Sequence, residues 1–167
     1  MAELRAHGIG VGLPAGWDAR ITVRHDGAPQ VAIAASGTKV ANLQARPVMH
    51  LANFGLPNDR GDFGSGAVEL MGDHDVFVVL FEHEPAATRT ALFASQGLPR
   101  TLALTDFDPY NCRRGIPGQS AYQAFFQESG RAFCLYVVIG SHPHRARLVP
   151  IVNKVLASVQ LDTAPAR

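Results

Sequence analysis

The residues that could do chemistry are spread along the chain and form no complete catalytic motif. Gly64-Ser65-Gly66 lacks the G-x-S-x-G spacing of a hydrolase nucleophile turn, and an extended segment rather than a helix is expected after it. The chain also lacks a P-loop, a dinucleotide fingerprint and an HExxH zinc motif. The acidic residues lie mostly in expected turns, where no pair of carboxylates can be located for acid–base work. The sequence therefore predicts no catalytic residue and no cofactor.

Three groups of residues contain histidines that a metal ion could use as ligands. His142-Pro143-His144 offers two imidazoles, whereas a zinc site needs three or four protein ligands. Asp73-His74-Asp75 and Glu82-His83-Glu84 stand at opposite ends of one expected strand. A strand of that length separates its ends by about 20 Å, so these two groups cannot share one ion. No metal site is predicted.

One histidine and two cysteines are the remaining reactive side chains. His50 alternates with apolar neighbours, which favours a hydrogen-bonded histidine of the core or of a cleft. Cys134 lies in the middle of an apolar strand and is expected to be a small buried hydrophobe. Cys112 lies in a polar loop beside Arg113 and Arg114, whose charges would lower the pKa of its thiol. No base is placed near Cys112 by the sequence, so no reactive role is predicted for it.

Length and composition are those of one ordinary globular domain. The chain has 167 residues, of which 47% are hydrophobic and 17% charged. A formal net charge of +1 argues against nucleic acid as the main partner, because phosphate binding needs a concentrated basic surface. The apolar runs are far shorter than a membrane span, and the first residues show no signal-peptide hydrophobic region. We expect a cytoplasmic protein with one domain over residues 1–167, a core over 8–161 and a frayed tail over 162–167.

Two stretches are apolar on both faces and are therefore expected at the centre of a covered sheet. They are residues 76–82 and 132–139. Residues 148–159 carry apolar side chains at the spacing of an amphipathic helix. Pro150 lies inside this pattern, so either the helix begins near Leu148 with Pro150 in its first turn, or it is kinked at the proline.

The rest of the chain reads as shorter strands joined by tight turns. Extended patterns cover residues 8–13, 17–24, 30–35, 48–54, 67–71 and 121–128. Asp26-Gly27 and Ser129-Gly130 are expected hairpin turns. A short helix capped by Thr88 is expected within residues 85–95. This order predicts the α+β class: a mostly antiparallel β-sheet flanked by helices.

Two motifs, one near each end of the chain, resemble the Mog1/PsbP-like group of small α/β/α sandwiches. The first is the L-P-x-G-W turn, and the second is the pattern L-V-x-I-V-x-x-V-L-x-S-V. The matching residues are Leu13, Pro14, Gly16, Trp17, Leu148, Ile151, Val152, Val155, Leu156, Ser158 and Val159. The resemblance does not cover residues 36–118. It implies an α/β/α sandwich and a binding or accessory role rather than catalysis, and it carries over no catalytic residue.

Two long glycine-containing loops, residues 57–66 and 108–119, are the candidate binding surface. Long irregular loops in compact domains are usually functional or disordered, and aromatic residues and arginine are enriched at interface hot spots. The predicted contact residues are Phe63, Tyr110, Arg113 and Arg114. The alternative is that both loops are exposed connections, with Asp59 and Asp62 paired to the two arginines across the surface.

The leading functional hypothesis is a non-enzymatic accessory or protein-binding module whose partner the sequence does not identify. The alternative is a small-molecule-binding or hydrolytic enzyme with a cleft between sheet and helix. A deep pocket that holds His50, or another histidine beside serine or aspartate, would favour the enzyme. A shallow surface that exposes Phe63 or Tyr110 would favour the binding module.

Overall fold

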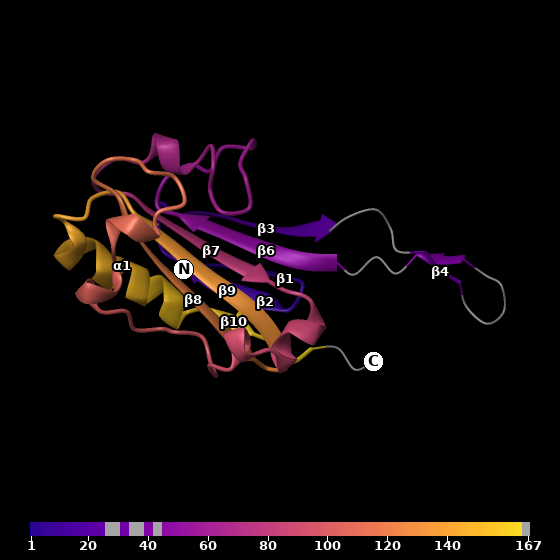
Figure 1. Cartoon of the computed structure of the whole chain (residues 1–167). Helices are drawn as coiled ribbons and strands as arrows, with labels where there is room; N and C mark the ends of the chain where they lie inside the picture. Colours follow the sequence, from indigo (N-terminus) through magenta and orange to yellow (C-terminus); the bar gives the residue numbers. More distant parts are fainter. Residues whose placement is uncertain (26–30, 34–38, 42–44, 165–167) are drawn as a thin grey trace.

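The main sheet of the protein has five antiparallel strands. The computed structural model describes residues 1–25, 31–33, 39–41 and 45–164. The strands run in the order β3 (Asp18–His25), β6 (Ala45–Ala52), β7 (Val76–Glu82), β9 (Arg131–Ile139) and β8 (Ser120–Glu128) (Figure 1). The expectation that residues 76–82 and 132–139 form central strands is confirmed. A separate two-stranded pair joins β4 (Val31–Ile33) to β5 (Lys39–Ala41).

The two faces of strand β9 belong to two different hydrophobic clusters, as the alternation of its residues requires. Leu135 and Val137 pack in the cluster on the first face, whereas Cys134 and Tyr136 pack in the cluster on the second. All nine residues of β9 are buried. A strand with no wet face is stable only when both faces of its sheet are covered, and here different elements cover each one.

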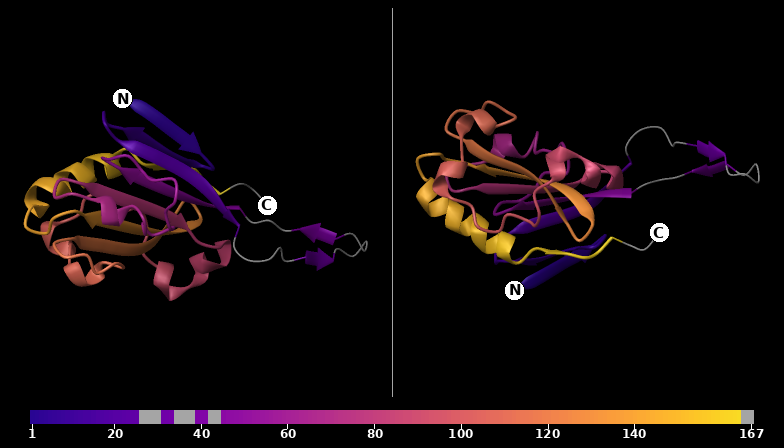
Figure 2. Two further views of the ribbon diagram at one scale, coloured as in Figure 1. Left: turned by 90° about the horizontal axis from the view of Figure 1, so that it is seen from above. Right: turned by 60° about the horizontal axis from the view of Figure 1, so that its bottom comes forward.

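The first face is covered by helix α1 (Arg145–Ala157) and by a small antiparallel sheet. The small sheet has the order β1 (Ala2–Ala6), β2 (Ile9–Leu13) and β10 (Gln160–Leu161). Strands from the two ends of the chain therefore lie side by side (Figure 2). Their apolar side chains join those of α1 in one cluster with the main sheet. Strand β1 lies outside the predicted core of residues 8–161.

The second face is covered by loops and short 3₁₀ helices instead of an α-helix. They comprise η1 (Val68–Leu70), η2 (Pro85–Arg89), η3 (Ala91–Phe93), η5 (Pro109–Asn111) and the loops around them. The segment that contains η4 (Leu104–Asp106) packs instead against α1 on the first face, where Leu102 N donates to Asn153 Oδ1 at 2.8 Å. Phe54, Phe63, Met71 and Ile116 pack from these segments against the cluster of the second face. The α+β class with an antiparallel sheet is therefore confirmed, and α1 is the one α-helix in the part of the chain that the structure describes.

Helix α1 begins three residues before the predicted start, and this changes the position of Pro150. The helix starts at Arg145, so Pro150 lies in its second turn and donates no hydrogen bond to the carbonyl of Ala146. The proline is exposed, on the side away from the sheet. At the other end, the Ser158 hydroxyl donates to Val155 O and accepts from Gly12 N at 3.2 Å, which ties the helix end to β2. No helix among the described residues is long and apolar enough to cross a membrane.

Three local predictions are wrong, and each has a backbone cause. Residues 67–71 are not extended, because Ala67 N and Val68 N both donate to Gly64 O and so begin η1. The expected helix within 85–95 is two 3₁₀ segments, and Thr88 lies inside η2 rather than capping it. The strand predicted at 48–54 spans Ala45–Ala52 and passes through Pro47, where β6 pairs with β3 but not with β7. A proline is tolerated at this position because β6 is unpaired there on the side that faces β7.

The other strand and turn predictions agree with the structure wherever it describes the residues. The patterns at 8–13, 17–24 and 121–128 correspond to β2, β3 and β8. The Ser129-Gly130 turn joins β8 to β9, and both of its residues have positive φ. Of the strand predicted at 30–35, residues 31–33 are described, as β4. The turn predicted at Asp26-Gly27 lies outside the described residues.

Candidate functional site

The two predicted loops lie together over the second face of the sheet, and we call residues 57–66 and 108–119 the loop face. Phe63 from the first loop stacks on Phe81 of β7, with ring centroids 5.0 Å apart. It also meets Tyr136 of β9 edge-on at 5.9 Å. From the second loop, the Arg113 guanidinium lies 3.8 Å from the centroid of the Phe63 ring. Two of the predicted contact residues, distant in sequence, are thus in direct contact.

Arg113 is held in this position by its own backbone. Its N–H donates a 2.9 Å hydrogen bond to the Tyr136 hydroxyl, which fixes the loop to strand β9. Burial raises the pKa of Tyr136, so its phenol stays neutral and accepts this bond. The guanidinium is therefore presented at the surface with one flat side on an aromatic ring.

The other two predicted contact residues have different surroundings. Tyr110, in η5, has 96% of its surface exposed. Arg114 forms an ion pair with Glu69 at 2.8 Å. Hydrogen bonds from backbone N–H groups, its own first, hold the pKa of the Glu69 carboxyl below its usual value, and Arg114 adds to this effect.

The predicted alternative pairing across the loop face is not what the structure contains. Asp62 pairs with Arg24 of β3 at 3.3 Å, and Arg114 pairs with Glu69 rather than with Asp59 or Asp62. The Arg24 guanidinium also lies 3.6 Å from the centroid of the Phe81 ring. Asp62 and Arg114 therefore pair with neighbours that the sequence spacing did not suggest.

His50 is a buried, hydrogen-bonded histidine of the core, which confirms the prediction. Arg60 Nε donates to His50 Nδ1 at 2.9 Å, and His50 Nε2 lies 2.8 Å from the carbonyl oxygen of Asp62. This pattern requires a neutral ring with its proton on Nε2. Burial lowers the pKa of His50, and the charge of Arg60 lowers it further. The ring fixes the first loop to β6 and stacks on Phe77 at 5.6 Å.

The cysteines are both free, and neither has the properties of an activated thiol. Cys134 is fully buried, as predicted. The expected lowering of the Cys112 pKa is wrong: burial raises it, and the negative charge of Asp108 adds to the effect. The side chain packs into the cluster of the second face, and this burial outweighs the effect expected of Arg113 and Arg114. Among the residues that the structure describes, no three His, Cys, Asp or Glu side chains gather where a metal ion could bind.

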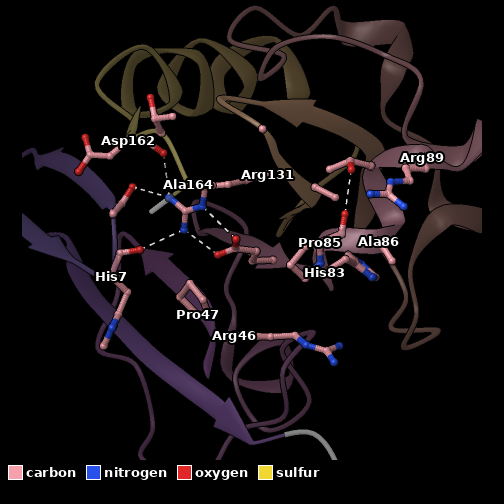
Figure 3. Close-up of a pocket in the computed structure, with 16 residues that line it drawn as sticks. His7, Arg46, Pro47, His83, Pro85, Ala86, Arg89, Arg131, Asp162 and Ala164 are labelled. Atoms are coloured by element: carbon pink, nitrogen blue, oxygen red, sulfur yellow. Dashed lines mark hydrogen bonds and ion pairs between the residues drawn. The ribbon is translucent and has the colours of Figure 1, made fainter. Parts of the chain in front are cut away.

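A pocket of about 850 Å³ that shares no lining residue with the loop face lies at the end of the sheet where β7 ends and β9 begins (Figure 3). Its wall comes from the β1–β2 turn, the first part of β6, the end of β7, η2, the start of β9 and residues 162–164. It contains His7, His83 and Asp162, so it combines histidine with aspartate, the composition named above for the enzyme alternative. His50 does not line it, and neither serine nor cysteine is among the described residues that do. The Asp162 carboxylate accepts two hydrogen bonds from Arg5, at 3.0 and 3.1 Å.

Arg131 is the residue that joins the segments of this pocket wall, and the sequence analysis did not identify it. It binds Glu82 through two hydrogen bonds of 2.9 and 2.6 Å. Its remaining N–H groups donate to three backbone carbonyls, those of His7, Gly8 and Asp162. All five donors of the guanidinium are therefore used (Figure 3).

The expected tail is bonded to this wall as far as the structure describes it. Asp162 N donates to Gly8 O at 2.9 Å, and Ala164 N donates to Ser129 O at 3.1 Å. A signal for the Arg131–Glu82 pair was present in the sequence: two opposite charges stand at the ends of two strands that are otherwise apolar. In an antiparallel pair of central strands, the end of one meets the start of the other.

Comparison of the chain with protein-family models, with curated proteins and with solved structures gives no match.

Proposed function

We propose that the protein is a non-enzymatic binding module that recognises a protein partner through the loop face. Two observations in the loop face carry this proposal: the Arg113 guanidinium stacks 3.8 Å from the centroid of the Phe63 ring, and Tyr110, in the same loop as Arg113, is 96% exposed. Aromatic residues and arginine are the side chains that dominate interface energetics when they lie in a well-ordered surface.

Two physical features support recognition by this face. Tyr110 is a large amphipathic side chain with its apolar ring in water, and its burial against a partner would be favourable at a low cost in side-chain entropy. Arg113 is already ordered by its backbone bond to Tyr136 and by its stacking on Phe63. The Arg113 side chain therefore loses less conformational entropy when a partner binds, and more of the contact energy contributes to affinity.

We propose the Mog1/PsbP-like group as the family of this fold. Support comes from the two motifs that suggested it. Pro14 and Gly16 form a turn between β2 and β3 in which Trp17 N donates to Pro14 O at 3.2 Å. The second motif is the helix that follows the all-apolar strand β9 and packs on the sheet. A binding or accessory role, which that resemblance implies, agrees with the role proposed for the loop face.

The test is the double substitution Arg113→Ala with Arg114→Ala in a tagged full-length chain. Partner proteins would be recovered from an extract of the native cells and quantified by mass spectrometry for the wild type and the variant. We expect recovery of a specific partner to fall by about tenfold or more, because hot-spot truncations cost more than about 1.4 kcal/mol. Tyr110→Ala should have a similar effect.

Stability should change little in the same variants. The exposed pair of Arg114 and Glu69 is worth about 0–1 kcal/mol, and the Arg113 stack about 0.5–1 kcal/mol. Arg147→Ala, an exposed arginine on α1, is the matched control and should leave partner recovery unchanged. If the double variant recovers every partner as the wild type does, the loops are connections and this proposal is wrong.

A further inference from the structure

We propose that two copies of this chain associate by antiparallel pairing of their β1 strands. Strand β1 is the outermost strand of the small sheet, whose order is β1, β2 and β10 (Figure 2). It therefore pairs with β2 on one side only. The small sheet covers the first face of the main sheet and the loop face lies over the second, so this association does not depend on the function proposed for the loops.

The backbone groups of Glu3 and Arg5 point away from β2, towards the free edge. In an antiparallel pair, hydrogen-bonded residue pairs alternate with pairs whose N–H and C=O groups point outward. Glu3 lies opposite Gly12, and Gly12 N donates to Ser158 Oγ at 3.2 Å on the side away from β1. Glu3 and Gly12 are therefore a non-bonded pair, and Arg5, two residues further along β1, has the same orientation as Glu3.

The turn between β1 and β2 gives this orientation independently. It has two residues, His7 and Gly8, with φ values of 52° and 72°. Positive φ at both positions defines a type I′ hairpin turn, and the two residues that flank such a turn form a hydrogen-bonded pair. Ala6 therefore bonds β2, and by alternation the neighbouring Arg5 does not.

No described segment covers the free edge of β1. Outside the β1–β2 ladder, no described residue bonds to the backbone of Glu3 or Arg5, and both residues are exposed. The features that usually block an edge are missing from Ala2–Ala6, which has no proline and no lysine and pairs with β2 without a bulge. The edge of β8 differs, because Gly97 N donates to Gln127 O there.

The sequence of the strand, Ala-Glu-Leu-Arg-Ala, is complementary to itself. With Leu4 on a two-fold axis, Glu3 of each copy lies opposite Arg5 of the other, and the two residues exchange both of their N–H···O bonds. Opposite charges that face each other across a strand pair are favourable, and like charges are unfavourable. An axis at Glu3 or at Arg5 would place two like charges opposite each other. Only the register centred on Leu4 uses the free backbone groups and pairs unlike charges.

The two charged side chains are placed for this pairing. The Glu3 side chain is 63% exposed, and its ion pair is with Arg5 of its own strand at 3.5 Å. Arg5 passes over Gly10 of β2 and bonds Asp162 through Nη1. Arg5 Nε, the donor nearest to the Arg5 backbone, makes no hydrogen bond with the described residues. The Glu3 carboxylate of a second copy can therefore approach Nε while the bond to Asp162 remains.

Leu4 contributes apolar contact on the other side of the strand. It is half-buried against the cluster of the first face. In the dimer the two Leu4 residues form a non-bonded pair, the kind in which facing side chains lie closest. Because two five-residue strands make a small interface, we expect weak association, with a dissociation constant between about 10 µM and 1 mM.

The first test is the mass of the full chain, without a tag at its N-terminus, by sedimentation velocity between about 10 µM and 1 mM. We expect the mass to rise from that of a monomer towards that of a dimer. Glu3→Pro removes an outward N–H, so it should abolish the rise and leave the melting temperature nearly unchanged. Leu4→Pro is the matched control: it removes an N–H that bonds β2, so it should lower the melting temperature.

Single cysteines test the register. Ala2 of one copy should lie opposite Ala6 of the other, so an oxidised mixture of the Ala2→Cys and Ala6→Cys proteins should form a disulfide-linked dimer. Each variant alone should stay unlinked, because its two cysteines would be about 14 Å apart, beyond the reach of a disulfide. The wild type, with Cys134 buried and Cys112 half-buried, should also stay unlinked. In amide exchange, Glu3 and Arg5 should become protected as the protein concentration rises.

Three results would overturn the proposal. A mass that stays monomeric at about 1 mM would leave the edge to a strand of another protein and exclude self-association. A dimer that persists in Glu3→Pro would use another surface. Equal linking in Ala2→Cys alone and in the mixture would contradict the register centred on Leu4.

Discussion

Removal of Arg131 tests the reasoning about the pocket wall most directly. Arg131→Ala leaves the Glu82 carboxylate, 17% exposed, without the bidentate donor that compensates its burial. It also leaves the carbonyls of His7, Gly8 and Asp162 without these donors. Breaking a buried ion pair by removing one partner costs about 3–5 kcal/mol. Because Glu82 borders an open pocket that water can enter, we expect the lower end, about 3 kcal/mol.

The assay is urea unfolding followed by the fluorescence of Trp17, the single tryptophan of the chain. Arg114→Ala is the matched control, since that arginine pairs with Glu69 at side-chain exposures of 57% and 36% and should cost no more than about 1 kcal/mol. A double variant, Arg131→Met with Glu82→Leu, should recover about half of the loss, because no buried charge is left unpaired. Should Arg131→Ala unfold at the same urea concentration as Arg114→Ala, the pair does not stabilise the fold and the argument fails.

Three further predictions concern the core and its titratable groups. Leu135→Ala should lower the free energy of unfolding by about 2–5 kcal/mol, and amides of β7 and β9 should exchange most slowly; faster exchange there than in β3 or β8 would contradict the strand order. The folded pKa of His50 is lowered from 6.5, so its unfolded ring binds protons more readily. The contribution of the neutral His50 ring to the free energy of unfolding is therefore complete above pH 6.5 and is lost as the pH falls towards the folded pKa. Over that range the melting temperature of His50→Gln should fall less than that of the wild type. Because burial raises the pKa of Cys112, its alkylation by iodoacetamide at pH 8 should be slower than that of free cysteine; an equal rate would exclude a raised pKa.

The central strands could be predicted from the sequence because burial on two faces leaves a direct pattern in the residues. Residues 76–82 match β7 without a shift, and residues 132–139 fall within β9. The segments that cover the second face could not be predicted in this way. Gly64 and Gly66 have positive φ and send the chain into η1, where an alternating pattern had indicated a strand. A turn of this kind depends on single backbone angles, which side-chain periodicity does not report.

The loop face and the pocket differ in how far the sequence foretold them. Composition alone singled out Phe63 and Arg113, and the structure brings them into contact. The pairing of acidic residues with arginines could not be predicted, because Glu69, the partner of Arg114, belongs to η1 and lies outside both loops. The pocket was beyond prediction for a stronger reason: its wall combines six segments of the chain, and only the register of the sheets brings them together.

The small sheet also constrains the order in which the protein can become complete during synthesis. Its middle strand, β2, is made early and pairs on one side with β10, which is made after every strand of the main sheet. Helix α1, made just before β10, is also needed to cover the first face. A nascent chain that ends at His144 would therefore lack α1 and β10, and the part of the first face that they cover would be open to water. Limited proteolysis of that fragment should cut within β7 and β9, which the whole chain protects. Folding of this domain is thus expected to be a single late event, with the apolar face a target for chaperones until residues 145–161 have been added.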